Sequence, residues 1–222
     1  MADSDPDDEV PALPADTLAI LQQFQQEQLE RQRQLEALEN GGPAQDAGAA
    51  DIEIQEDWQL SQFWYDDHTA STLAKEALRC AGDKGRIALV SCPTLYKPLL
   101  RLKGPECTVK LLEFDKRFSV YGENFTFYDY NTPTELPEDL TRSFDVVVAD
   151  PPFLSPECLS KVALTIQLLS RGKIILCTGA VMQQLAESLL HLRKCQFVPH
   201  HKNNLGNEFA CYANYELDSF LS

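Results

Sequence analysis

The stretch FDVVVADPPF, residues 144–153, decides the fold. Its first part, Phe144–Ala149, is a short Val-rich apolar run, which is typical of a strand buried on both faces. Asp150–Phe153 follows at once, and its two prolines do not continue a strand ladder. We therefore expect a buried strand that runs directly into a rigid turn.

Similar apolar runs occur along the chain on both sides of this stretch. They are Arg86–Ser91, Thr108–Phe114, Asn124–Tyr128, Lys173–Cys177, Gln196–Pro199 and Glu208–Tyr215. Helical patterns separate most of them, at residues 66–81, 95–102, 156–170 and 180–193. Strands alternating with helices indicate a parallel sheet with crossover helices. No helix separates the last two runs, so we expect them to pair as an antiparallel hairpin at one edge.

The predicted fold class is therefore α/β, with a seven-stranded, mostly parallel sheet and a terminal antiparallel strand. This is the Rossmann-like arrangement of class I S-adenosylmethionine-dependent methyltransferases. In such sheets ligands bind beyond the carboxyl ends of the strands. The residues that follow each run are the ones to search for chemistry.

Charge divides the chain of 222 residues, whose net charge is −15. Residues 1–57 hold 15 acids and only 2 bases, Arg31 and Arg33. We interpret them as an acidic, partly disordered leader with a Gln-rich amphipathic helix at about 17–40 and a linker. The apolar stripe of that helix fits either a partner or the chain's own domain. Residues 58–222 are nearly neutral, and we expect them to form the methyltransferase domain.

Composition also excludes several classes of protein. A nearly neutral domain argues against a nucleic-acid groove, which needs a clustered basic face. No apolar run approaches the ~18 residues of a membrane span, and the acidic N-terminus does not resemble a signal peptide. The seven cysteines lack paired metal-site spacing, so no metal is expected and they are interpreted as small buried hydrophobes. A cytoplasmic monomer is expected.

Asp150, Pro151, Pro152 and Phe153 carry the most specific chemistry. The prolines keep the chain rigid and leave the main-chain carbonyls free to accept hydrogen bonds. A carboxylate and these carbonyls hold an amine by its hydrogens, and Phe153 offers an aromatic face to a cation. Such a site suits in-line methyl transfer from a sulfonium donor to an amine. The alternative is a rigid turn that only terminates the strand.

Acidic side chains follow the next two strands. Glu113 and Asp115 close one run and, being two residues apart, are expected on the same side. An acid at this place commonly binds ribose hydroxyls; the alternative is a solvated strand end balanced by Lys116 and Arg117. Asp129 is placed either to accept from an adenine amino group or to sit in a turn.

The first strand ends differently. Its turn, Ser91–Tyr96, contains no glycine. A nucleotide site after a first strand usually has a Gly-rich turn that lets the backbone approach the ligand. By itself, the turn at Ser91–Tyr96 therefore counts against nucleotide binding.

Seven segments together resemble the eukaryotic elongation factor 1-alpha lysine methyltransferase 1 family. They are WQLSQFWY (58–65), EFDKRF (113–118), YGE (121–123), FYDYN (127–131), ADPPF (149–153), KIILCTG (173–179) and NLGNEF (204–209). The family was earlier described as adenine-specific DNA methyltransferases, because of the Asp-Pro-Pro-Phe/Tyr motif. It too lacks the Gly-rich turn. The resemblance covers residues 57 to about 216.

The resemblance implies a cytoplasmic enzyme that uses S-adenosylmethionine to methylate a lysine of translation elongation factor 1-alpha. Asp150–Phe153 would hold the amine. The implied cofactor residues are Ser61, Tyr65, Ser91, Pro93, Glu113, Asp115, Asp129, Tyr130 and Asp150. The implied substrate wall, or simply a turn, is formed by Asn204, Asn207 and Glu208. We expect His200 and His201 at the surface.

Two other functions stay open. The first is methylation of adenine in DNA, which the Asp150–Phe153 chemistry fits equally well. It calls for a basic groove and base flipping, which the charge pattern does not favour. The second is a non-catalytic binding module with a methyltransferase fold, for which the missing glycine turn is the best argument.

Overall fold

A computed structural model describes residues 54–57, 60–203 and 205–220. The predicted leader helix at 17–40 lies outside the described residues. Residues 54–57, which the charge boundary assigns to the leader, contact the domain. Ile54 is buried, and the Glu56 carboxylate accepts hydrogen bonds from the Trp64 main-chain N–H (2.6 Å) and the Asn203 amide (2.8 Å).

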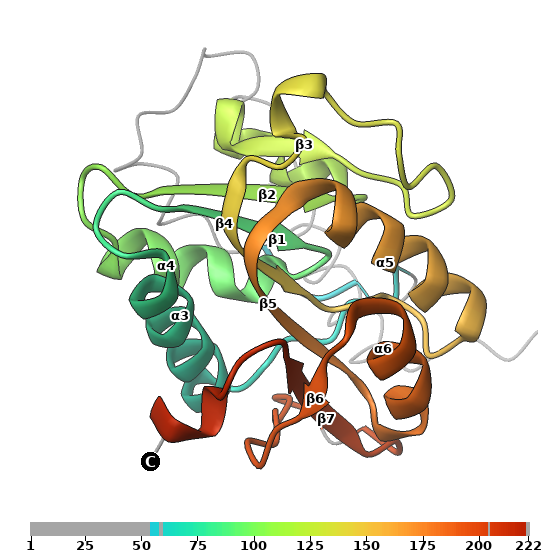
Figure 1. Ribbon diagram of the computed structural model, residues 1–222. Coiled ribbons are helices and arrows are strands. Elements are labelled where there is room, and N and C mark those ends of the chain that lie inside the picture. Colours follow the sequence, from blue (N-terminus) through green and yellow to red (C-terminus); the bar gives the residue numbers. More distant parts are fainter. Residues whose placement is uncertain (1–53, 58–59, 204, 221–222) are drawn as a thin grey trace, which may run out of the picture. The chain divides into compact units, whose positions relative to one another are not determined.

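The described chain forms a seven-stranded sheet in the order β3-β2-β1-β4-β5-β7-β6 (Figure 1). The strands are β1 Arg86–Val90, β2 Thr108–Glu113, β3 Phe125–Phe127, β4 Phe144–Ala149, β5 Ser170–Gly179, β6 Arg193–Lys194 and β7 Phe209–Ala213. β1 to β5 pair in parallel, and β7 runs antiparallel to both β5 and β6. The predicted fold class is confirmed, with the reversed last strand inserted between β5 and β6.

The strand predicted at Gln196–Pro199 is wrong. The sixth strand is the two-residue β6, Arg193–Lys194, and residues 196–199 are irregular. The Asp218 carboxylate accepts hydrogen bonds from the main-chain N–H groups of Gln196 (2.9 Å) and Phe197 (3.3 Å). These amides are therefore satisfied by a side chain instead of a neighbouring strand.

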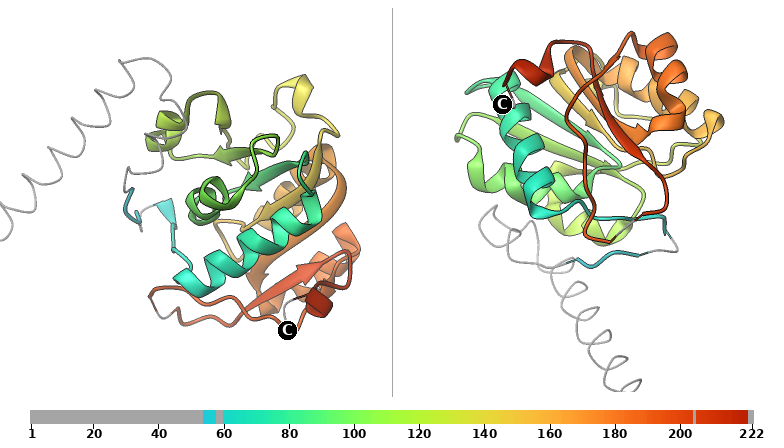
Figure 2. Two further views of the ribbon diagram at one scale, coloured as in Figure 1. Left: turned by 90° about the vertical axis from the view of Figure 1, so that its left-hand side faces the viewer. Right: turned by 90° about the horizontal axis from the view of Figure 1, so that it is seen from below.

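Two helices cover each face of the sheet (Figures 1 and 2). α3 (Asp67–Ala81) and α4 (Tyr96–Leu102) lie on one face, and α5 (Pro156–Leu169) and α6 (Gln183–Leu190) on the other. α3 begins where the Asp66 carboxylate accepts from the Thr69 N–H (2.7 Å) and ends at Gly82. Its apolar side chains Ala70, Leu73, Ala74 and Ala77 are buried.

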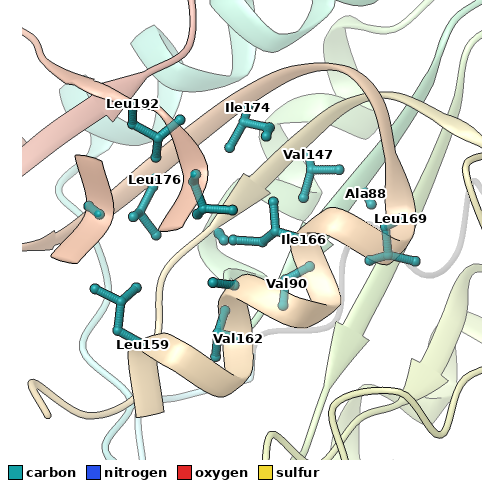
Figure 3. Packing of buried hydrophobic residues seen from close by; sticks show 14 of the residues in the cluster. Ala88, Val90, Val147, Leu159, Val162, Ile166, Leu169, Ile174, Leu176 and Leu192 are labelled. Carbon is teal, nitrogen blue, oxygen red and sulfur yellow. The ribbon is translucent and has the colours of Figure 1, made fainter. Parts of the chain in front are cut away.

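The core lies between the sheet and these helices. Side chains alternate along β1, so that Ala88 and Val90 face α5, where they pack with Val162 and Ile166 (Figure 3). Ile87 and Leu89, on the opposite side of β1, are also buried, which explains the uninterrupted apolar run. Six of the seven cysteines are buried too. No described helix is long and apolar enough to span a bilayer.

Candidate active site

A cavity of about 480 Å³ lies at the sheet edge where β1, β2 and β4 end. Its lining residues are 60–64, 91–94, 113–114, 128–131, 150–154, 201, 205–207 and 209. Since parallel strands end at one edge of a sheet, turns that are distant in sequence meet here. The volume is in the usual range for a small-molecule site, about 300–1,000 Å³.

Most of the predicted site residues line this one cavity. They are Ser61, Ser91, Pro93, Glu113, Asp129, Tyr130, Asp150, Pro151, Pro152, Phe153 and Asn207. The structure thus brings together the Asp-Pro-Pro-Phe motif, the first turn and the acid that ends β2. Phe153 is half exposed, and its ring meets Tyr130 edge-on with 5.7 Å between centroids. This aromatic pair is reachable from solvent.

Asp115 does not line the cavity. β2 ends at Glu113, so the alternation that would place both acids on one side stops before Asp115. Its carboxylate instead pairs with Arg117 (2.6 Å) and accepts from the Gln62 side-chain amide (2.9 Å). Burial raises the pKa of Asp115, but hydrogen bonds from Arg117 and Gln62 outweigh it and bring the pKa below its usual value.

Tyr65 and Glu208 do not line the cavity either, and Asn204 lies outside the described residues. The Tyr65 side chain is fully buried. The Glu208 side chain is 78% exposed and comes within 4.0 Å of the Lys194 ammonium group. Of the three predicted substrate-wall residues, Asn207 is the one that reaches the cavity.

His201 is a cavity residue that the sequence analysis missed. It was expected at the surface, as its neighbour His200 is, but it is partly buried and lines the cavity. Tyr65 and His201 form an antiparallel bridge, and their rings lie 4.9 Å apart (Figure 2 shows the two segments). Burial lowers the pKa of His201 below its ordinary value, which favours the neutral ring. Only the long-range pairing of the two segments reveals this position.

The glycine-free first turn is made by Ser91. Its φ of 51° is in the left-handed region that usually favours glycine, and its N–H donates to the Leu112 carbonyl (2.9 Å). Pro93 then begins a short 3-10 helix, Pro93–Leu95. The backbone turns tightly without glycine, which removes the main argument against a ligand site here.

Glu113 is a buried carboxylate, 6% exposed, that faces the cavity. Burial raises its pKa to about 7; the N–H groups of Asp115 and Phe114, at 3.2 and 3.0 Å, oppose this, and the Asp115 charge adds to it. Among the described residues no lysine or arginine forms an ion pair with Glu113. Its charge is available to a ligand.

Asp150 is in a similar state. It keeps part of its surface open to the cavity, while the surrounding protein raises the pKa of its carboxyl group to about 7. The Glu113 charge works in the same direction, whereas the Tyr65 hydroxyl lowers the pKa. Both carboxyl groups of this cavity therefore change their protonation state near neutral pH.

The cavity wall is acidic. Its described lining includes Glu113, Asp129 and Asp150 but no lysine or arginine. Such a wall suits a ligand that carries a positive charge and donates hydrogen bonds from hydroxyl groups. Phe114 and Tyr130 add aromatic surface for a flat ring. These features fit S-adenosylmethionine, which combines a sulfonium, ribose hydroxyls and adenine.

Fold and site together define a Rossmann-like methyltransferase with an Asp-Pro-Pro-Phe motif after β4. The sequence profile of the family described as "Probable N6-adenine methyltransferase" matches residues 56–217. This chain belongs to that family of methyltransferases, and its cofactor is S-adenosylmethionine.

Relatives in animals and yeast match almost the whole chain. EEF1A lysine methyltransferase 1 of Gallus gallus is 53% identical, over 95% of this chain and 97% of that protein. The Homo sapiens protein of the same name is 50% identical, over 95% and 94%. Protein-lysine N-methyltransferase EFM5 of Saccharomyces cerevisiae is 34% identical, over 94% and 93%.

Two solved structures share the fold. The branched-chain polyamine synthase of Thermus thermophilus has a TM-score of 0.54 at 15% identity, covering 75% of this chain and 61% of that one. The magnesium protoporphyrin IX methyltransferase of Synechocystis, solved with bound S-adenosylmethionine, has a TM-score of 0.50 at 11% identity, covering 93% and 100%. At these identities the likeness concerns the fold.

Proposed function

We propose that this chain is a protein-lysine N-methyltransferase that methylates a lysine of translation elongation factor 1-alpha in the cytoplasm. The relatives that match it over nearly its full length carry this activity in their names. The observation that carries the proposal is the acidic cavity behind the Asp-Pro-Pro-Phe motif. The positive charge of a lysine side chain suits the acidic lining of that cavity, and its amine hydrogens suit the hydrogen-bond acceptors of the motif.

The residues of the motif would position the amine. Asp150 and the main-chain carbonyls of the proline turn accept hydrogen bonds from the nitrogen, and Phe153 covers the cationic side-chain end. S-adenosylmethionine supplies the electrophilic methyl group, while Glu113 would accept from its ribose hydroxyls. Asp129, Tyr130, Ser91 and Ser61 would complete the cofactor wall.

Asp150 would also help the amine to lose its proton. A free lysine has a pKa of ~10.4 and a free aspartate ~3.9, so transfer between them costs roughly 9 kcal/mol. With the pKa of Asp150 at about 7, the cost falls to roughly 5 kcal/mol. Removal of the ammonium group from water lowers the cost further, because burial disfavours the charged form.

The experiment is methyl transfer from labelled S-adenosylmethionine to three acceptors: the purified elongation factor, double-stranded DNA and a protein extract. We expect label in the elongation factor, located on lysine by mass spectrometry. Nuclease treatment of the extract should leave the label unchanged, and protease should release it. Label in DNA, or only in another protein, would overturn the proposal.

Adenine methylation in DNA is the second candidate. The family description and the Asp-Pro-Pro-Phe motif favour it, since the exocyclic amine of adenine also offers hydrogens to accept. The cavity lining of the described chain has no lysine or arginine to meet a phosphate group. The DNA arm of the same experiment tests this candidate.

A further inference from the structure

The Tyr65 hydroxyl is buried without a hydrogen-bond partner of normal geometry. Within the described residues this is true of three buried side-chain groups, the hydroxyls of Tyr65, Thr178 and Tyr212. Leaving such a group unpaired is costly to the folded state, so native proteins seldom keep one without a role. Tyr65 is the one of the three that adjoins a carboxyl group of the cavity.

The Tyr65 ring is held in place from both sides of the chain. The neighbouring Asp66 N–H donates to the His200 carbonyl (2.9 Å), and the Lys202 N–H donates to the Trp64 carbonyl (2.8 Å). The His201 ring packs against Tyr65 and, on its other side, against Phe209 at 4.5 Å. With the ring clamped in this way, the hydroxyl has little freedom to move to another partner.

Four titratable groups face Tyr65 from the elements around it. They are Asp150 after β4, Cys92 after β1, Cys177 on β5 and His201 in the loop before β7. Asp150 in turn faces Tyr65 and Glu113. The Cys92 thiol stays protonated, because burial raises its pKa well above the usual value. Asp150 is therefore the group that can accept a hydrogen bond from the Tyr65 hydroxyl.

We propose that Tyr65 is a positioning residue for Asp150, donating a hydrogen bond to the Asp150 carboxylate from behind while the substrate amine occupies the cavity side. Tyr65 does not line the cavity, so it acts through Asp150 and not on the substrate. The hydrogen bond would fix the carboxylate in the orientation that receives the amine. It would also favour the ionised form, against the burial and the Glu113 charge that disfavour it. This inference deepens the proposed function and rests on it.

Tyr65→Phe removes the hydroxyl and keeps the ring that packs on His201. Tyr212→Phe is the matched control, because it deletes another buried, unpaired hydroxyl, from β7, at a residue that does not line the cavity. Both variants are checked for thermal unfolding and for S-adenosylmethionine affinity by calorimetry. We expect the melting temperature of each variant to stay within a few degrees of the parent protein. We expect the cofactor affinity to stay within twofold when it is measured at pH 9, where Asp150 is ionised in all three proteins.

The kinetic test is the pH profile of methyl transfer. We expect Tyr65→Phe to lower kcat about tenfold to a hundredfold at pH 7, with KM nearly unchanged. The acidic limb of its profile should move up by about one pH unit, and the loss should shrink at pH 9. Tyr212→Phe should follow the parent protein. If the acidic limb of the Tyr65→Phe profile does not move, the proposal is refuted, and Tyr65 has only a structural role.

A second readout needs no acceptor. Carbon-13 NMR of labelled aspartate carboxyls in the free protein gives the pKa of Asp150 directly. We expect that pKa to rise by about one unit in Tyr65→Phe and to stay unchanged in Tyr212→Phe; an unchanged value in both overturns the inference. A parent protein that transfers nothing to the elongation factor would defeat the proposed function but leave this titration informative.

Discussion

Two pairs of carboxylates in this domain, buried or partly buried, have opposite surroundings. Glu76 on α3 and Asp115 after β2 each pair with an arginine, at 2.8 and 2.6 Å. Glu113 and Asp150, at the cavity, have no arginine or lysine partner among the described residues. Burial works against ionisation in all four groups, yet hydrogen bonds bring the pKa of the first two below normal, while that of the last two rises to about 7.

The contrast distinguishes a carboxylate that stabilises the fold from one kept for a ligand. An arginine partner satisfies the buried charge and leaves nothing for a substrate. A buried carboxylate without an arginine partner destabilises the ligand-free protein near neutral pH. A bound cation or hydroxyl group stabilises the charge of that carboxylate, so this cost is recovered on binding. Glu113 and Asp150 are in this second state, which is typical of functional sites.

The largest expected effect comes from Asp150→Asn. The amide keeps the size of the side chain but loses the charge that accepts the proton and directs the amine. We expect kcat to fall by at least about a thousandfold, with cofactor binding still measurable by calorimetry. A kcat within tenfold of the parent value would remove Asp150 from the mechanism.

The same variant should gain stability. The folded-state pKa of Asp150 is raised, so the folded protein holds a proton that the unfolded chain has lost, and stability falls as pH rises from about 4 through 7. Without this group, the free energy of unfolding at pH 8 should increase by at least about 1 kcal/mol, since one pKa unit corresponds to about 1.4 kcal/mol. Urea unfolding at pH 8 and pH 5 tests this, and the gain should shrink at pH 5.

Glu76→Gln tests the other side of the comparison. The Glu76 carboxylate accepts from Arg79 at 2.8 Å twice and from the Tyr215 hydroxyl at 2.8 Å. Its pKa is lowered, so its contribution is present above the unfolded pKa and is lost as pH falls below it. We expect a loss of about 2 kcal/mol at pH 7.5 by urea unfolding, opposite in sign to Asp150→Asn, with unchanged cofactor affinity. Equal stability of variant and parent would contradict the pairing argument.

Local pattern was enough to predict most of this architecture. Uninterrupted apolar runs marked the strands, and the Asp-Pro-Pro-Phe turn marked the sheet edge where the cavity lies. The turn at Ser91 was harder, because a left-handed serine leaves no trace in the sequence. The alternation that predicts Asp115 at the site stops two residues before it, because β2 ends at Glu113.

One side of the cavity is formed by the segment before α3 and the loop before β7, which are distant in the sequence. Ser61 and Tyr65 were connected with the cofactor only through family resemblance, and His201 was expected at the surface. The positions of Tyr65 and His201 follow from the pairing of the segment before α3 with the loop before β7. No periodicity within either segment encodes that contact, so sequence patterns alone do not place it.

The smallest expected effect is the pH dependence of cofactor binding. Ribose hydroxyls and a sulfonium both prefer ionised carboxylates, so binding should release protons from Glu113 and Asp150. Affinity for S-adenosylmethionine should therefore rise from pH 6 to 8, by at most about tenfold per pH unit for each group, and level off above. Glu113→Gln should weaken binding about tenfold at pH 8 and keep only the dependence due to Asp150. Calorimetry in buffers of different ionisation enthalpy counts the released protons, and a flat affinity with none released would mean that the two unpaired carboxylates do not serve the cofactor.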